Sequence, residues 1–298
     1  MKKIFMVMLS VIMLITISST SAFGANRETE KTNPLDTGKE ILYYQYWTSD
    51  EKIESDLQNL QKELELSDEQ MSALKELGLT EYQNNTELAS TYSSNARSSI
   101  LAFNTTIESR TIERNETIKT ILDENYSDFR NWIASWWENE REYRMNTIKP
   151  MADDNSIEVW ATQYVPTTSG AAEVALPDKY LKFANLGWDN TYPNPDYIVD
   201  VRSISHSSNL AGIRVDEVGP WNENDNYWDY DRRIFTDLDL GVPEAMVAYY
   251  NDYNNGKDEF GRTVLNPAGI DLSTKAAKSL GFSSYESGWV IVNYTDLP

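Results

Sequence analysis

Residues 269–281, G-I-D-L-S-T-K-A-A-K-S-L-G, decide the fold of the C-terminal half of the chain. Ser273 is a residue type favoured at the N-cap of a helix, and Gly281 is typical of a helix end. The small and apolar positions between them predict a short helix over 273–280. Asp271 therefore lies where an extended segment passes into a helix.

A second stretch, residues 212–221, has the sequence G-I-R-V-D-E-V-G-P-W. It predicts a strand that ends in a Gly-Pro turn, with two adjacent carboxylates near the strand end. Successive side chains on a strand point to opposite faces, so only one of Asp216 and Glu217 can face a given cleft.

Short alternating segments elsewhere after residue 150 also predict strands, with a helical segment over 243–250 between two of them. The last strand, G-W-V-I-V-N-Y, suits a buried closing position. Together these segments indicate a compact β-barrel or α+β domain that begins near residue 155. The predicted strands cover residues 158–165, 197–203, 211–218 and 288–294.

The two stretches resemble the double-psi β-barrel of the rare lipoprotein A and expansin group. In that group, V-R-V-x-D-x-G-P is followed by I-D-L-S-x-x-A-A-x-x-L-G and a final strand. This chain has R-V-D-E-V-G-P, then I-D-L-S-T-K-A-A-K-S-L-G, then G-W-V-I-V. Residues 159–164 look like the first barrel strand, and residues 175–177 and 197–201 follow in the expected order. The resemblance covers about residues 155–296 and implies a six-stranded double-psi β-barrel with an aromatic-rich insertion.

The sequence also departs from that group. Glu217 stands where the group usually has Asp, Val218 stands where it often has Arg, and its early histidine has no evident counterpart. The stretch 221–267 is much longer than the usual link. A fold tolerates a long loop, so the expected barrel survives the insertion. The departures bear instead on whether the activity is shared.

The resemblance implies glycan chemistry, with Asp271 and Glu217 as the candidate catalytic residues. Lytic transglycosylases of this barrel protonate the glycosidic oxygen with one acidic residue, which matches Asp271. Such an acid needs a pKa above the ordinary value of ~3.9. Burial, or a nearby carboxylate such as Glu217, provides that. The alternative is that Asp271 is a helix N-terminal residue that offsets the helix dipole.

Aromatic residues are the candidates for glycan binding, because their rings stack on sugars. They are Trp221 and Trp228 of the insertion, with Tyr164 from the first predicted strand. We place Trp221 nearest the cleft because it directly follows the Gly-Pro turn. The alternative for the insertion is that its aromatic side chains form a small core of their own.

No cofactor is predicted, and calcium is the one metal for which the sequence offers candidates. Asp252, Asn254 and Asp258 carry side-chain oxygens around a glycine, which resembles a short calcium loop. An ordinary turn is the alternative, because the twelfth position is Thr263 and not Glu. With no cysteine and one histidine, His206, the chain does not favour a zinc site.

Residues 48–150 are predicted to form a helical domain, either a bundle or a long helical hairpin. Capping boxes at Thr48 and Ser67 start its first two helices, and Gly78 is expected to end the second. Residues 80–124 contain neither Pro nor Gly and predict one long helix or two joined ones. We interpret the apolar stripes as a bundle core and not as a membrane-active device, because the polar faces are acidic.

The N-terminus predicts export. Lys2 and Lys3 precede an apolar run over 4–17 and a small, polar end, as in a cleavable signal peptide over 1–24. The run is shorter than the ~20 residues of a membrane-spanning helix, although an uncleaved anchor is the alternative. Because the sequence contains no cysteine, a lipoprotein anchor on a lipid-modified cysteine is not expected. We therefore expect a secreted or cell-wall-associated protein without membrane insertion after cleavage.

The charge balance limits the partners. The net charge is −21, from 47 acidic and 26 basic residues, which opposes binding to nucleic acid and to anionic lipid. The expected ligand is peptidoglycan or another cell-wall polysaccharide. An unknown protein partner is expected for the helical domain.

Three functional hypotheses follow. In the first, the barrel domain binds, and in its stronger form cleaves, peptidoglycan or a related glycan, in the manner of a lytic transglycosylase. In the second, it is a non-catalytic, expansin-like glycan-binding protein. In the third, the helical domain is the active part of a secreted interaction or toxin-like factor. The expected organisation is a signal peptide (1–24), a leader or linker (25–47), the helical domain (48–150) and the barrel domain (155–298).

Overall fold

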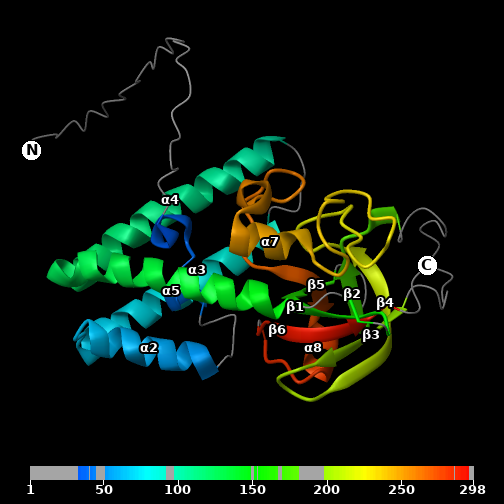
Figure 1. The fold of residues 1–298 in the computed structure, drawn as a ribbon, viewed down its shortest axis with the longest axis horizontal. Coiled ribbons are helices and arrows are strands. Elements are labelled where there is room, and N and C mark those ends of the chain that lie inside the picture. Colours follow the sequence, from blue (N-terminus) through cyan, green and yellow to red (C-terminus); the bar gives the residue numbers. More distant parts are fainter. Residues whose placement is uncertain are drawn as a thin grey trace, which may run out of the picture. The chain divides into compact units, whose positions relative to one another are not determined.

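The fold consists of N-terminal helices followed by a closed barrel of six strands (Figure 1). Asn33–Pro298 form one compact unit, so the helices and the barrel are not separate lobes. None of the described helices has both the length and the apolar character needed to cross a membrane. The computed structural model describes residues 33–39, 41–44, 51–91, 97–148, 151–152, 154–166, 170–180, 198–284 and 286–294.

The helical block has one main apolar core, to which each of its longer helices contributes buried side chains. A smaller cluster is formed by Leu88, Phe103 and Ile107 with Leu265. The capping box at Ser67 is confirmed: its hydroxyl accepts from the Gln70 amide at 3.1 Å, and the Gln70 side chain accepts from the Ser67 amide at 3.0 Å. Thr48 lies outside the described residues. The elements of the block are η1 (Pro34–Thr37), α1 (Ile41–Tyr44), α2 (Glu51–Glu63), α3 (Asp68–Thr91), α4 (Arg97–Leu122), η2 (Asp123–Asn125) and α5 (Tyr126–Thr147).

Gly78 does not end a helix, so that prediction is wrong. Helix α3 continues through Gly78 to Thr91, and the described residues of the range 80–124 belong to α3, α4 and the first part of η2. A Cβ atom at Gly78 would lie 2.1 Å from the carbonyl oxygen of Leu42 in α1. The glycine therefore allows α1 and α3 to approach closely, which the helical pattern of α3 alone does not reveal.

The described residues of the predicted leader or linker, 33–39 and 41–44, are packed against the helices. Leu35 and Ile41 are fully buried. The Asp36 carboxylate accepts two hydrogen bonds from the Arg130 guanidinium, at 2.7 and 2.8 Å. This segment therefore belongs to the helical block, whereas the predicted signal peptide and residues 25–32 lie outside the described residues.

The barrel closes in the strand order β1-β5-β2-β4-β3-β6. The pairs β1/β5 and β2/β4 are parallel, and the other pairs are antiparallel. The predicted strands are present, with ends shifted by one or two residues, and Ser273 caps α8 (Thr274–Ser279) as expected, accepting from the Ala276 amide at 3.3 Å. The strands are β1 (Ser156–Tyr164), β2 (Glu173–Leu176), β3 (Ile198–Ser203), β4 (Asn209–Val218), β5 (Ala268–Ser273) and β6 (Gly288–Asn293).

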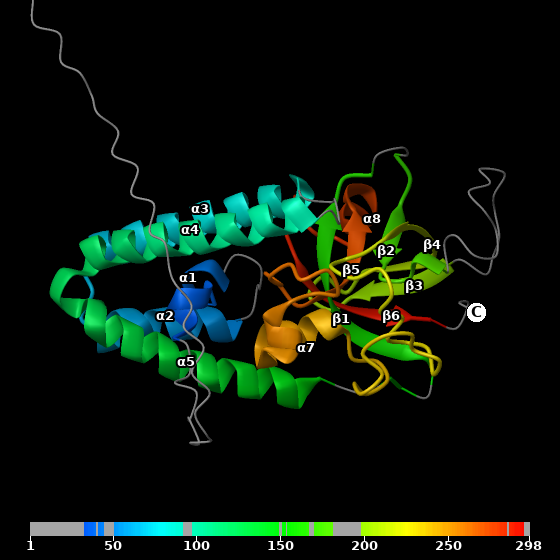
Figure 2. The same cartoon turned by 90° about the horizontal axis from the view of Figure 1, so that it is seen from above.

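The insertion between β4 and β5 joins the barrel to the helical block. It contains α7 (Glu244–Asn251) and η4 (Tyr253–Gly256). In Figure 2, α7 lies between α5 and the strands, and it contacts both α5 and β5. The Trp137 ring of α5 meets Tyr249 edge-on at 5.6 Å and lies nearly parallel to Tyr250 at 6.0 Å. The insertion is thus a structural joint and not a free loop.

Candidate functional site

Asp271 lies in the middle of β5, on the outer face of the barrel. Its neighbours Ile270 and Leu272 belong to the barrel core, so alternation turns Asp271 outward. It is therefore a strand residue and not part of the first turn of α8, which begins at Thr274. The helix-dipole alternative for this residue does not fit that placement.

The strand pairing brings Asp271 and Glu217 onto one face. Ala175 of β2 is the paired residue of both Asp271 in β5 and Glu217 in β4. The pairing of β2 with β4 shifts register after Val174, which skips Asp216 and aligns Glu217 instead. The side chain of Asp216 accepts from Arg214 at 2.6 Å. Glu217 and Asp271 thus pair with the same residue of β2 from its two sides.

A small residue separates the two carboxylates. Neighbouring strands lie about 4.8 Å apart, so the backbones of Asp271 and Glu217 are roughly 9–10 Å apart with Ala175 between them. Ala175 is only 3% exposed, so other groups of the protein cover its methyl group.

The environment of Asp271 favours its protonated form more than water does. Burial raises the pKa of Asp271 to about 6, although the hydrogen bond from the Thr162 hydroxyl to its Oδ1 atom lowers it. Thr162 is the residue paired with Asp271 on β1. At mildly acidic pH a large share of Asp271 therefore carries a proton that it can donate.

Tyr164 brings a third carboxylate into the site. Its hydroxyl donates to Oε1 of Glu173 at 3.1 Å, and Glu173 is only 4% exposed. Burial and the negative charges of Glu173, Asp271 and Glu217 raise the pKa of Tyr164. The tyrosine hydroxyl is therefore close to all three acids. Glu173 was not predicted from the sequence, although its alternation with Ala175 along β2 places both on the same face.

The two predicted tryptophans have different positions. Trp221 is partly buried; its indole nitrogen donates to Asn266 at 3.0 Å, and its ring packs against apolar residues of both the insertion and the helical block. Trp228 is only 6% exposed, and its ring stacks on Tyr294 with centroids 5.0 Å apart. Trp228 therefore belongs to the barrel core and not to a separate core of the insertion, and its ring does not face solvent as a sugar platform.

The calcium candidates are engaged within the chain. Asp252 forms an ion pair with Lys39 at 2.6 Å, and Asp258 forms one with Arg262 at 2.5 Å. Asn254 donates its side-chain amide to the carbonyl of Lys257 at 2.7 Å. Within the described ranges, no three or more His, Cys, Asp or Glu side chains gather in a way that could hold a metal ion.

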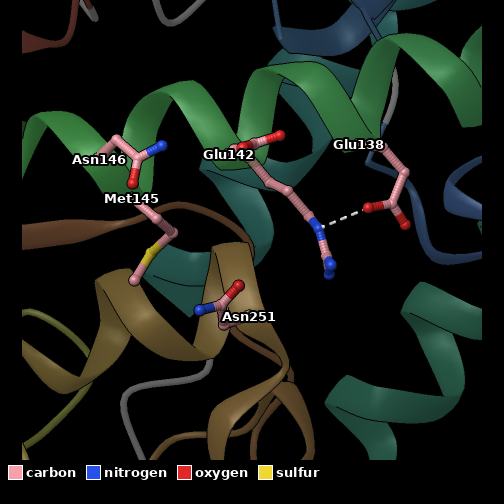
Figure 3. A pocket seen from close by; sticks show the side chains of 6 residues that line it. Glu138, Glu142, Met145, Asn146 and Asn251 are labelled. Carbon is pink, nitrogen blue, oxygen red and sulfur yellow. Dashed lines mark ion pairs between the residues drawn. The ribbon is translucent and has the colours of Figure 1, made fainter.

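A separate pocket of about 250 Å³ lies between the end of α5 and the end of α7 (Figure 3). The Arg141 guanidinium forms an ion pair across part of it with Glu138, at 3.0 Å. Neither Asp271 nor Glu217 lines this pocket. Its lining residues are Glu138, Arg141, Glu142, Met145, Asn146 and Asn251.

Comparison with known proteins places a family boundary at the start of the barrel. Residues 155–293 match a family described as a domain of unknown function (DUF8814). This range contains the Asp271 face and the insertion but not the helical block. No curated protein and no solved structure matches the chain.

Proposed function

We propose that the barrel binds a cell-wall glycan, peptidoglycan or a related polymer, over the face that carries Asp271 and Glu217, and that Asp271 cleaves it as a general acid. The observation that carries the proposal is the shared pairing of both acids with Ala175. The raised pKa of Asp271 supports its role as the acid. The resemblance to the double-psi barrels of the rare lipoprotein A and expansin group supports the choice of a glycan.

The proposed reaction needs only protein side chains and the substrate. Asp271 gives its proton to the glycosidic oxygen while the bond from that oxygen to the anomeric carbon breaks. A hydroxyl of the same sugar then attacks the anomeric carbon and closes an anhydro ring. The proton of that hydroxyl goes to the Asp271 carboxylate or to Glu217, which restores the acid directly or through solvent. Two carboxylates on one face are a recurring arrangement for splitting glycosidic bonds.

Tyr164 and Glu217 have supporting parts in this proposal. Because the Tyr164 hydroxyl donates to Glu173, its oxygen remains an acceptor for a sugar hydroxyl. Glu217 faces the developing positive charge at the anomeric carbon from the other side of Ala175. The predicted signal peptide supports export to the exterior, where such a glycan is found.

The test is to incubate the exported form of the full chain with purified peptidoglycan between pH 5 and pH 7 and to identify released fragments by mass spectrometry. We expect anhydro-sugar fragments, and we expect Asp271→Asn to abolish them. Asp216→Asn is the matched control, because this neighbouring carboxylate is skipped by the strand pairing. Absence of both release and sedimentation with the wild-type protein would refute the proposal.

A non-catalytic, expansin-like binding role is the second candidate. It is favoured by Glu217 and Val218, which stand where the resembled group has Asp and Arg. In that case the wild-type protein sediments with insoluble wall but releases no fragments, and Asp271→Asn binds as well as the wild type.

An interaction role for the helical block is the third candidate. Leu101 and Ile112 of α4 are 67% and 66% exposed, and their spacing of eleven residues places them on one side of that helix. A protein partner that covers this side would protect both from solvent. Replacing both with Glu in the full chain should then abolish binding of that protein partner while leaving glycan binding intact.

A further inference from the structure

We propose that Glu244 is a proton-held latch, which keeps α7 docked between the barrel and α5 while it is neutral and releases α7 when it loses its proton. Glu244 is the first residue of α7 and is fully buried. The preceding residue, Pro243, packs on β5, where a Cβ atom added to Gly269 would lie 2.7 Å from its ring. The start of α7 therefore touches the barrel, while Tyr249 and Tyr250 touch α5.

The carboxyl group of Glu244 is only half satisfied. Its Oε2 atom accepts from the Asn222 side chain at 2.8 Å. Its Oε1 atom is buried and has no hydrogen-bond partner among the described residues. A buried carboxylate oxygen without a donor costs free energy, whereas a neutral carboxylic acid is far less costly to bury.

The charged groups that face Glu244 compensate a negative charge there only in part, through Arg232. Asp225 and Asp258 are acidic, and Tyr253 is the further titratable group. The nearby arginines are already engaged, Arg232 by Asp225 at 2.5 Å and Arg262 by Asp258 at 2.5 Å. Ionised Glu244 would therefore be a third acid beside two existing ion pairs. Of these groups, Tyr253 belongs to η4, Asp225 and Arg232 precede α7, and Asp258 and Arg262 follow η4.

The balance of effects keeps Glu244 protonated near neutral pH. Burial raises the pKa of Glu244 to about 8, and the charges of Asp225 and Asp258 add to this, while Asn222 and Arg232 oppose it. Its place at a helix N-terminus favours the carboxylate, but desolvation is the largest effect on this group. Desolvation therefore decides. Above pH 8 the new charge is relieved by moving the start of α7 into water.

Limited proteolysis of the full chain with a broad-specificity serine protease tests the latch. Cleavage within residues 241–267 is located by mass spectrometry between pH 7.5 and pH 9.5, and rates are divided by those of an unstructured peptide. In the wild-type protein we expect an increase on the order of tenfold across this range, because each pH unit above the pKa changes the docking equilibrium tenfold. Near-ultraviolet circular dichroism follows the Trp137 contacts in parallel.

The variants decide the outcome. Glu244→Gln keeps the acceptor for Asn222 but has no proton to lose, so its rate should change less than twofold. Asp231→Asn removes an exposed acid of the same insertion and should behave as the wild type. Glu244→Met, of similar length, is the second variant and should match Glu244→Gln. The proposal is overturned if the cleavage rate of the Gln and Met variants rises with pH as much as that of the wild-type protein. It is also overturned if the wild-type rate does not rise.

Discussion

Replacing Trp137 with Ala should destabilise the whole protein, because its ring lies at the contact between the helical block and the insertion. Trp137 is 6% exposed; it meets Tyr249 and Tyr250, and Lys39 Nζ lies 5.7 Å from its ring centre. Removal of a buried Trp costs about 3–5 kcal/mol, including the cavity that it leaves. Because the ring also makes two aromatic contacts and one cation–π contact, we expect about 4 kcal/mol or more.

Urea unfolding measures this loss. The far-ultraviolet circular dichroism signal follows mainly the helices, and tyrosine and tryptophan fluorescence follows both parts. With an m-value of about 3 kcal/mol/M, a loss of about 4 kcal/mol lowers the urea concentration at the unfolding midpoint by about 1.3 M. Both signals should shift together if the contact couples the two parts.

Trp132→Ala is the matched control, since it removes the same side chain from the same helix. Trp132 is only partly buried, and its indole nitrogen donates to Glu63 of α2 at 2.8 Å, within the helical block. We expect a loss of about 1–2 kcal/mol. An equal loss in the two variants, or a shift of the helical signal alone with Trp137→Ala, would refute the view that Trp137 couples the helical block to the barrel.

Three further predictions concern stability. Gly78→Ala, which normally favours a helix, should cost about 2–3 kcal/mol in urea unfolding because its methyl group would collide with the carbonyl of Leu42; a gain in stability would contradict the close contact of α1 and α3. Tyr227→Phe should cost about 1–3 kcal/mol in the same assay, because the hydroxyl donates to Gly269 at 2.9 Å and lies 2.7 Å from the hydroxyl of Tyr294; an unchanged midpoint would show that neither bond matters. Asp271→Asn should stabilise the protein at pH 8 by up to about 3 kcal/mol and have little effect near pH 3.8. An acid whose pKa is raised in the folded state contributes its full stability below its ordinary pKa of 3.8. That contribution to stability is lost as the pH rises through about 6. Unfolding at both pH values checks the sign, and a variant that is less stable at pH 8 would count against the raised pKa.

Local sequence signals predicted the elements of the fold better than their packing. The capping box at Ser67 and the cap at Ser273 depend on a side chain and a backbone amide three residues apart, and both are present in the structure. Gly78 shows the limit of such signals, because its role is set by Leu42, which is 36 positions away in the sequence. A glycine can end a helix, but Gly78 lies inside α3 and lets α1 pack closely against it.

Asp271 and Glu217 were named as candidates only through the resemblance to a known family. The register of that family selected Glu217 over Asp216, and the physical cause is the shift in pairing after Val174, which no pattern in β4 itself reveals. Glu173 was missed because its importance comes from the Tyr164 hydroxyl on another strand. Trp228 was offered as a sugar platform because composition does not tell an exposed ring from one stacked on Tyr294.

The outer face of β1 connects the candidate site to the helical block. Trp160, Thr162 and Tyr164 alternate along this strand and so share one face. Trp160 is 1% exposed, meets Trp289 edge-on at 5.4 Å and belongs to the core of the helical block. Two residues further on, Thr162 already contacts Asp271. The helical block therefore covers the same face that the site occupies, and its removal would expose Trp160 and Trp289 beside the acids. For this reason a glycan test on the isolated barrel would not distinguish a missing activity from a damaged surface, and the full chain is required.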